Sequence, residues 1–266
     1  MSNRSLIYLY GVVPADAPAP PPELRGLEGA PLSLVSSGAV AGVVSEVPEA
    51  LYASEVLEPR LAELAWVGER ALAHENALTW FSDRGPVVPM QPFSLHASES
   101  LVRERLLAGA DALGAQLERL AGRRQWGVRL WLEESELRPH LHELSAALGA
   151  LRAEMESASP GRRFLLAKKL EARSAEELRS VAAAQARSVL ERLRAHAVAG
   201  RALPIPAAAA EGRTLVLNAV LLVDDTSFAR FQQQVTEEAH ASRPLGFELE
   251  FTGPWPAYHF VELDAF

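Results

Sequence analysis

Hydrophobic and polar positions in the first 122 residues repeat with periods typical of both strands and helices. Leu6–Val13 is an apolar, aromatic and β-branched run that ends at Pro14, which predicts a strand. The runs 32–35 and 39–45 flank Ser36-Ser37-Gly38 and predict a hairpin. The stretch 57–81 is predicted to be largely helical, and its apolar positions near one face are Leu61, Leu64, Val67, Ala71, Leu78 and Phe81.

Breaks and caps delimit the elements that follow. Asp83-Arg84-Gly85-Pro86 is predicted to end the helix, and the apolar segment 87–93 is stiffened by its prolines. Ser98 is predicted to cap the next helix, which stops near Gly122. The predicted buried face of that helix consists of Leu106, Leu113, Leu117 and Leu120.

The period changes at Trp126. Trp126, Val128, Leu130 and Leu132 alternate with Gly127, Arg129 and Trp131, which predicts a strand. Apolar residues then recur at steps of four and three, at Leu137, Leu141, Leu144, Leu148, Leu151 and Met155. After a break at 157–161, the stretch 164–198 is a second long helical pattern, so we predict a helical hairpin. Its apolar seam serves core packing or, alternatively, a partner-binding coiled coil.

The remaining pattern completes an α+β fold. The stretch 200–212 is predicted to be a loop, and Leu215–Val223 a central strand. Asp225 is predicted to cap a helix that buries Phe228, Phe231 and Val235. Phe247, Leu249 and Phe251 alternate with polar residues and predict a last strand. The order strand, long helical excursion, strand, helix, strand favours an α+β sandwich of the ferredoxin-like kind.

The chain end after this last strand is unusually stiff. Gly253-Pro254-Trp255-Pro256 has a nearly fixed backbone, because each proline restricts its own φ and the preceding residue. We therefore expect this end to be docked, with its large aromatic side chains in a pocket.

Composition narrows the functional classes. The chain has 266 residues and a formal charge of -8, which argues against nucleic acid as the main partner. It has no cysteine, so disulfides, thiolate nucleophiles and cysteine-bound zinc are excluded. No stretch has the roughly 20 apolar residues of a membrane span. Because the N-terminal apolar run is also too short for a signal peptide, we expect a cytoplasmic protein that does not bind lipid.

Motifs that carry chemistry are weak. His74-Glu75 matches half of a zinc protease motif, but the second histidine would fall at Leu78, so we predict no metal site, no cofactor and no catalytic residues. A rival hypothesis is a small-molecule enzyme that uses His74, Glu75 and Arg84, or a regulatory protein that binds a small molecule on its sheet. The basic run Arg162, Arg163, Lys168, Lys169 and Arg173 is interpreted as a solvated helix face.

Several motifs, in this order, resemble the gas vesicle protein F/L family from end to end. They are Tyr8–Val13, Gly42–Val47, His74-Glu75, Val87-Val88-Pro89-Met90, Trp126-Gly127-Val128-Arg129, Gly161–Leu165 with Lys168, Asn218–Val223 and Gly253–Phe260. The last is the most specific. The chain departs from the family pattern after Met90, where Gln91-Pro92-Phe93-Ser94 replaces the usual Arg-Phe-Gly-Thr.

This resemblance implies a two-lobed accessory protein of gas vesicle formation, either a cytoplasmic assembly factor or a minor shell component of the gas vesicle. The implied partners are the hydrophobic major shell subunit and other gas vesicle accessory proteins, bound without catalysis. The expected domains are 1–122 (N-terminal α+β), 123–253 (ferredoxin-like, with long amphipathic helices) and 254–266. We interpret the last segment as a structural clasp. The candidate structural or interface residues are Tyr8, Tyr10, His74, Pro89, Met90, Trp126, Trp255, Pro256 and Tyr258.

Overall fold

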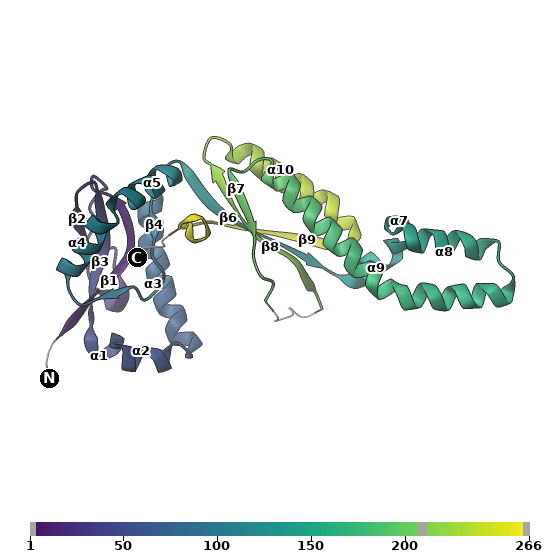
Figure 1. Ribbon diagram of the computed structural model, residues 1–266, viewed down its shortest axis with the longest axis horizontal. Helices are drawn as coiled ribbons and strands as arrows, with labels where there is room; N and C mark the ends of the chain where they lie inside the picture. Colours follow the sequence, from purple (N-terminus) through teal and green to yellow (C-terminus); the bar gives the residue numbers. More distant parts are fainter. Residues whose placement is uncertain (1–3, 207–211, 263–266) are drawn as a thin grey trace. The chain divides into compact units, whose positions relative to one another are not determined.

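The computed structural model describes residues 4–206 and 212–262, and the chain divides into two compact units. The first unit is Met1–Arg124 with Trp255–Phe266, and the second is Gln125–Pro254. Each unit is built around one antiparallel sheet covered by helices, a mixed α/β architecture (Figure 1).

The sheet of the first unit has the order β2-β3-β1-β4, with β5 also paired to β1. Its strands are β1 (Ser5–Pro14), β2 (Ser33–Ser37), β3 (Val40–Pro48), β4 (Val88–Pro89) and β5 (Leu95–His96). The predicted first strand and the hairpin are confirmed, since β1 covers 6–13 and β2 pairs antiparallel with β3. Gly38 turns the hairpin at a φ of 63°, a region that glycine enters without strain.

Helices cover both faces of this sheet. They are α1 (Glu49–Tyr52), α2 (Ser54–Arg60), α3 (Leu64–Ser82), α4 (Glu99–Ala108) and α5 (Ala110–Leu120), with the short turn η1 (Leu27–Gly29). Leu78 and Phe81 of α3 pack with Tyr8 and Val43 on one face. Gly42 faces Leu106 of α4 on the other. The predicted cap is confirmed, because Ser98 Oγ accepts a hydrogen bond from the Leu101 N–H at 3.3 Å.

The predicted apolar face of 57–81 is wrong in its first half. Leu61 and Leu64 are 48% and 87% exposed. The chain breaks between α2 and α3 at residues 61–63, so the two helices do not share one periodic face. The buried positions of α3 begin only at His74.

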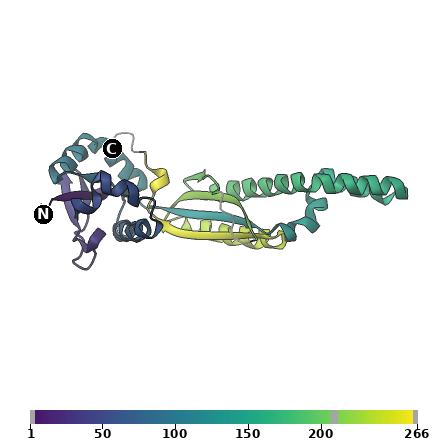
Figure 2. The ribbon, with the colours of Figure 1, turned by 90° about the horizontal axis from the view of Figure 1, so that it is seen from below.

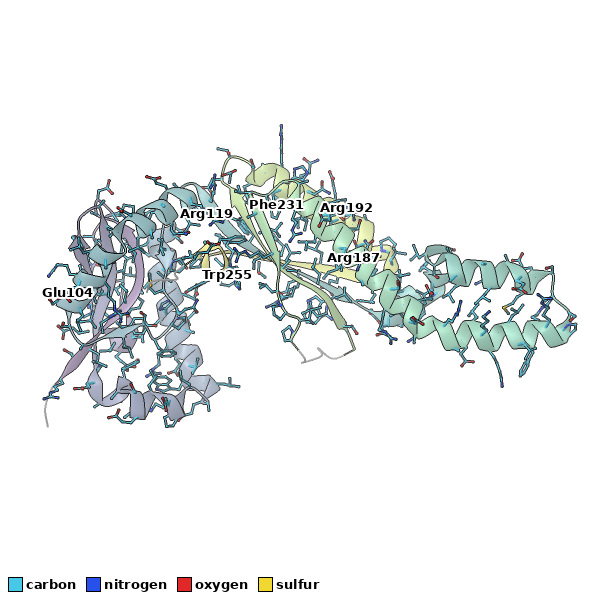
Figure 3. All side chains as sticks on the ribbon, viewed as in Figure 1. Glu104, Arg119, Arg187, Arg192, Phe231 and Trp255 are labelled. Atoms are coloured by element: carbon cyan, nitrogen blue, oxygen red, sulfur yellow. The ribbon has the colours of Figure 1, made fainter. Side chains whose placement is uncertain are left out.

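The second unit has the sheet order β7-β8-β6-β9. Its strands are β6 (Arg123–Leu132), β7 (Ala199–Ala202), β8 (Thr214–Asp224) and β9 (Phe247–Trp255). Its helical elements are α6 (Glu134–Leu137), η2 (Arg138–His140), α7 (Leu141–Leu144), α8 (Ala146–Glu156), α9 (Pro160–Arg194), α10 (Phe228–Ser242) and η3 (Arg243–Leu245). α9 and α10 lie on one face of the sheet, and Phe231 of α10 is fully buried in the core between them (Figure 3).

The long helical excursion forms the predicted hairpin, with two corrections. The seam over 137–155 is not one helix, because Ser145 ends α7 and caps α8 through the Leu148 N–H. Leu144, just before this break, is 43% exposed. The hairpin of α8 and α9 extends past the end of the sheet (Figures 1 and 2).

The strands after the hairpin differ from prediction at their connections. The predicted loop 200–212 begins with part of β7, a strand that pairs with β8, and its residues 207–211 lie outside the described residues. The predicted cap Asp225 is wrong, since α10 begins at Phe228 with Ser227 at its N-cap position. Across residues 4–206 and 212–262, no helix combines the length and apolarity that crossing a membrane requires.

Candidate functional site

Five of the residues singled out in the sequence meet in the core of the first unit. They are Tyr8, Tyr10, His74, Met90 and Tyr258. The rings of Tyr8 and Tyr10 on β1 lie 4.6 Å apart, and both lie within 5.6 Å of the His74 ring on α3. Because alternate residues of a strand point to the same face, positions 8 and 10 both face α3.

A chain of hydrogen bonds fixes the state of His74. The Phe93 N–H donates to Tyr8 Oη at 2.9 Å, and Tyr8 Oη lies 2.8 Å from His74 Nδ1. Burial lowers the pKa of His74 to about 4, an effect that the Met90 backbone opposes. A neutral imidazole has one acceptor nitrogen, and in the tautomer with its proton on Nε2 the Nδ1 atom accepts from the Tyr8 hydroxyl. Burial also raises the pKa of Tyr8, which keeps the hydroxyl proton in place.

Tyr10 and the β4 segment hold the other side of the cluster. Tyr10 Oη lies 2.8 Å from Ser45 Oγ and accepts from the Leu27 N–H at 2.7 Å. The Met90 N–H donates to the Tyr10 carbonyl at 2.9 Å, directly after Pro89 pairs with β1. These bonds satisfy buried polar groups, which is the usual structural task of a buried tyrosine.

The C-terminal segment 256–260 packs against the same cluster. Tyr258 stacks on His74 with ring centroids 6.3 Å apart, and Phe260 has no exposed surface. Burial, then the Glu75 carboxylate, raises the pKa of Tyr258. Pro256 is buried, whereas Trp255 is 46% exposed. The expectation that every large aromatic of this end fills a pocket is therefore wrong for Trp255.

The cluster lacks the access that catalysis requires. His74 has no exposed surface, so no solute reaches its ring, which counts against the small-molecule enzyme that would use His74, Glu75 and Arg84. The Arg84 guanidinium instead lies over the Trp80 ring, 4.0 Å from its centroid. Among the residues that the structure describes, no group of His, Asp and Glu is arranged to hold a metal ion.

Trp126 lies in the second unit, apart from this cluster. Its ring stacks between Phe228 of α10 and Phe251 of β9, with centroids 4.5 and 4.9 Å away. This stack belongs to the core under α10. Of the tryptophans noted in the sequence, Trp131, on the same strand, points instead toward a surface groove.

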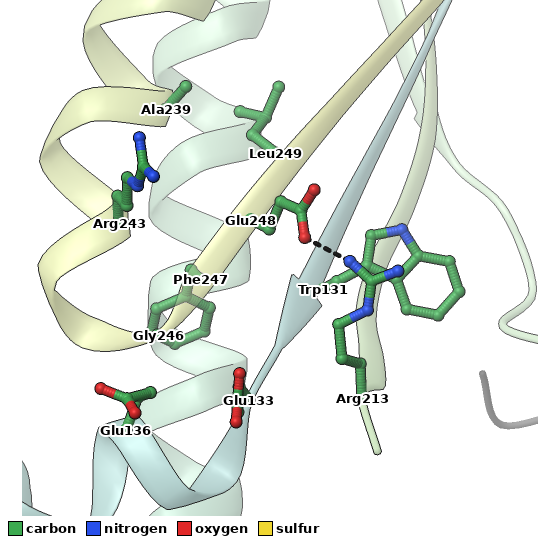
Figure 4. Close-up of a pocket in the computed structure, with 10 residues that line it drawn as sticks. All are labelled: Trp131, Glu133, Glu136, Arg213, Ala239, Arg243, Gly246, Phe247, Glu248 and Leu249. Atoms are coloured by element: carbon green, nitrogen blue, oxygen red, sulfur yellow. Dashed lines mark hydrogen bonds and ion pairs between the residues drawn. The ribbon is translucent and has the colours of Figure 1, made fainter. Parts of the chain in front are cut away.

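The groove lies beside β9, the edge strand of the second sheet (Figure 4). It has a volume of about 530 Å³. Ala239 and Arg243 of α10 and η3 form one wall, and Phe247 and Leu249 of β9 form the floor. The other lining residues are Trp131, Glu133, Glu136, Arg213, Gly246 and Glu248.

Ion pairs and aromatic contacts organise one wall of the groove. Arg213 pairs with Glu248, and its guanidinium lies 5.5 Å from the Trp131 ring centroid. Trp131 Nε1 donates to Glu250 Oε2 at 3.0 Å. Arg243, on the opposite wall, is exposed. The groove therefore combines an apolar floor with charges of both signs.

This arrangement suits binding of an extended segment. No described strand pairs with the outer side of β9, so over residues 247–251 the backbone groups on the side away from β6 face outward. An incoming strand can add to such an edge, with its alternate side chains in the groove. Sequence reasoning missed the groove, because its walls come from segments more than 100 residues apart; only the exposed-face position of Trp131 in β6 pointed to it.

Three comparisons place the chain among known proteins. The family model "Gas vesicle synthesis protein GvpL/GvpF" matches residues 6–262. Gas vesicle protein L of Streptomyces sp. (strain CB03234) is 31% identical over 98% of this chain and 94% of its own length. Gas vesicle protein L2 of Halobacterium salinarum is 25% identical over 90% of this chain and 84% of its own.

Two crystal structures share the fold. Gas vesicle protein GvpF from Anabaena sp. PCC7120 superposes with a TM-score of 0.65 at 19% identity, over 97% of this chain and 96% of that one. GvpF from Microcystis aeruginosa superposes with a TM-score of 0.63 at 16% identity, over 97% and 99%.

Proposed function

Because the chain belongs to the GvpL/GvpF family of gas vesicle synthesis proteins, we propose that it is an assembly accessory protein that binds the hydrophobic major shell subunit. A role in gas vesicle synthesis follows from the family. The proposal adds that the chain binds the shell subunit, that it does so without catalysis, and that it acts in the cytoplasm. Other gas vesicle accessory proteins are further partners in it.

The observation that carries the proposal is the amphipathic groove beside the open edge of β9. A shell subunit that polymerises must keep its apolar surfaces and strand edges covered until it is incorporated. Pairing with β9 would cover one such edge, and the half-buried Leu249 would cover apolar side chains. Retention of this chain in the mature vesicle as a minor shell component is compatible with the same contact.

The domain description belongs to the same proposal. We assign the unit Gln125–Pro254 as a ferredoxin-like domain. Support comes from its element order, strand, helices, two strands, helix, strand, and from its sheet order β7-β8-β6-β9. The residues 254–266 are proposed to act as a clasp; 263–266 lie outside the described residues.

Co-purification tests the proposal. The chain and the major shell subunit from the same gene cluster are co-expressed, and the complex is captured through a tag on this chain. Ala239→Trp fills the groove without removing a charge, so we expect it to abolish co-purification. Gln232→Trp, at an exposed position of α10 that does not line the groove, is the matched control.

Three outcomes are decisive. Loss of the shell subunit with Ala239→Trp alone supports the groove. Equal recovery with both variants would reject the groove as the binding surface. No recovery with the unmodified chain, together with normal vesicles in a deletion strain, would reject the shell subunit as a partner.

A further inference from the structure

The longest helix of the chain carries an uncovered face. α9 has 35 residues and continues past the sheet, with α8 beside it and no described strand beneath (Figures 1 and 2). In its C-terminal half, six residues are buried in the core of the second unit: Leu178, Ala182, Ala186, Val189, Leu190 and Leu193; the direction of this face is taken below from Ala182, Ala186, Leu190 and Leu193. The same face must continue along the N-terminal half, where the sheet has ended.

Helix geometry identifies the residues of that continuation. Five turns of an α-helix take about 18 residues and span about 27 Å, so positions 18 residues earlier point in the same direction. Those positions are Phe164, Lys168, Ala172 and Ala175. Leu165 and Arg179 lie on the same side, about 65° and about 25° from the centre of these four positions. These six residues are called the outer stripe of α9 below.

The outer stripe is exposed because α8 covers a different side of the helix. Leu166, which lies about 150° around the helix from the middle of the stripe, is buried. Phe164 and Leu165 are 60% and 67% exposed, which is unusual for two adjacent large apolar residues. Ala172 and Ala175 leave room for another backbone to approach closely.

The six residues of the outer stripe carry a net positive charge. Within the described part of the chain, neither Lys168 nor Arg179 forms an ion pair, whereas Arg162 and Arg192 pair with Glu154 and Glu238. The Lys168 ammonium lies over the Phe164 ring, 5.1 Å from its centroid. The six residues of the stripe include no carboxylate, but Glu171, 18 residues before the buried Val189 and about 55° from the centre of the first four positions, borders it.

This local charge contrasts with the rest of the molecule. Residues 146–175, which form the tip of the hairpin, carry six basic and three acidic side chains, in a chain with a formal charge of -8. A basic and apolar surface on an acidic protein selects for a partner of opposite charge.

We propose that the outer stripe of α9 binds an acidic amphipathic helix of a partner protein. The incoming helix would continue the packing that the sheet and α10 provide to the C-terminal half of α9. Its apolar residues would cover Phe164 and Leu165, and its Glu or Asp residues would pair with Lys168 and Arg179. From 164 to 179 the stripe is about 22 Å long, enough for four turns of helix. The inference is independent of the groove beside β9.

The observations favour this occupant over two others. Two copies of the chain meeting through this stripe would bring Lys168 and Arg179 against their own copies in the partner, which is repulsive. A bilayer would gain little from Ala172 and Ala175, which have almost no apolar surface to insert. Both remain outcomes of the test.

The test uses two fluorescent peptides of about 20 residues, each with leucines at helical spacing and either Glu or Lys at the remaining positions. Their affinity for the full chain is measured by anisotropy at low and high salt. We expect the acidic peptide to bind about tenfold more tightly than the basic one. Lys168→Glu combined with Arg179→Glu should remove that preference, and Phe164→Ser should weaken binding of the acidic peptide about tenfold.

A charge-matched control separates the stripe from general electrostatics. Arg152→Glu combined with Arg173→Glu changes the net charge equally, at exposed positions on the same hairpin but off the stripe. We expect this control to keep the preference, and circular dichroism melts to show all variants folded. Equal loss in the control, or no effect of Phe164→Ser, would overturn the proposal.

Two parallel measurements address the other occupants. In the first, the chain is mixed with vesicles that contain phosphatidylglycerol. The proposal would be overturned in favour of a membrane if the chain bound these vesicles, if Lys168→Glu abolished that binding, and if the vesicles displaced the acidic peptide. Self-association in sedimentation equilibrium that disappears with Phe164→Ser would overturn it in favour of a second copy.

Discussion

Lowering the pH from 7 to 5 should destabilise the first unit through His74. The ring is buried, is hydrogen-bonded to Tyr8 Oη through Nδ1, and has a pKa of about 4 in the folded chain. In the unfolded chain the same ring has the ordinary histidine pKa of 6.5. Between these two values the unfolded chain binds a proton that the folded chain does not.

The direction and size of the effect follow from that difference. A lowered folded-state pKa leaves stability intact above pH 6.5 and removes it as the pH falls toward 4, where the folded ring also becomes protonated. From pH 7 to pH 5 the free energy of unfolding should fall by about 2 kcal/mol through His74 alone. Over the whole window the loss approaches about 3 kcal/mol.

Comparison of wild type with His74→Gln isolates this contribution. Glutamine keeps a polar group opposite Tyr8 but does not titrate, so the remaining pH dependence, including that of Glu75, is common to both proteins. Urea unfolding followed by circular dichroism at pH 7 and pH 5 gives, for each protein, the change in the free energy of unfolding with pH. The transition of the first unit is the one that shifts with Phe260→Ala, because Phe260 is buried there.

A direct titration guards against a variant that folds poorly. The ring protons of His74 in wild-type protein, followed by NMR, should not titrate between pH 7 and pH 5. Titration near pH 6.5, or equal pH slopes for wild type and His74→Gln, would refute the argument that the ring is held neutral by burial.

Other substitutions test the packing of named residues. Phe260→Ala should lower the stability of the first unit by about 3 kcal/mol, whereas Trp255→Ala, 46% exposed in the folded chain, should cost about 1 kcal/mol or less by urea unfolding. A similar large loss for Trp255→Ala would support the clasp role for that residue. Gly246 has a φ of 79°, and in Gly246→Ala the new Cβ would lie 2.6 Å from Glu136 Cβ. This substitution should lower the free energy of unfolding by about 2 kcal/mol more than Gly122→Ala, where φ is also positive but no atom lies within 4 Å of the new Cβ. Equal melting temperatures of the two variants would contradict this. Ser145→Ala removes both the cap of α8 and the 2.7 Å hydrogen bond to Glu177, whereas Ser98→Ala removes only a helix cap, worth about 1 kcal/mol. Ser145→Ala should therefore destabilise the protein more. A larger loss of melting temperature for Ser98→Ala would show that Ser145 does not contribute through both bonds.

Long periodic segments of this fold were predictable from sequence. β1, β8 and α9 each carry enough alternation or helical repetition to determine their type locally. β7 was not, because Ala199-Gly200-Arg201-Ala202 has no strand propensity and becomes a strand only by pairing with β8. Leu64 is apolar at helical spacing, yet it is exposed because a break in the chain turns α3 away from the periodic face.

The candidate sites also depend on contacts between distant parts of the chain, which local sequence does not predict. The sequence pointed to the residues of the aromatic cluster one by one, but not to their contacts. Tyr8 and His74 are 66 positions apart, and their hydrogen bond is determined by packing alone. The groove beside β9 depends on the order of strands in the sheet, which leaves β9 at an edge. Local sequence does not encode which strand ends up outermost.

The return of the chain to the first unit has a consequence for synthesis. This unit is interrupted after Arg124 and resumes at Trp255, so its sequence is discontinuous. Tyr258, which stacks on His74, and the buried Phe260 leave the ribosome about 130 residues after the rest of that unit, at roughly 5–20 residues per second. For several seconds the nascent first unit lacks its final core residues, and a chain truncated before Tyr258 never acquires them. The second unit, by contrast, has its whole sequence available before the first can close.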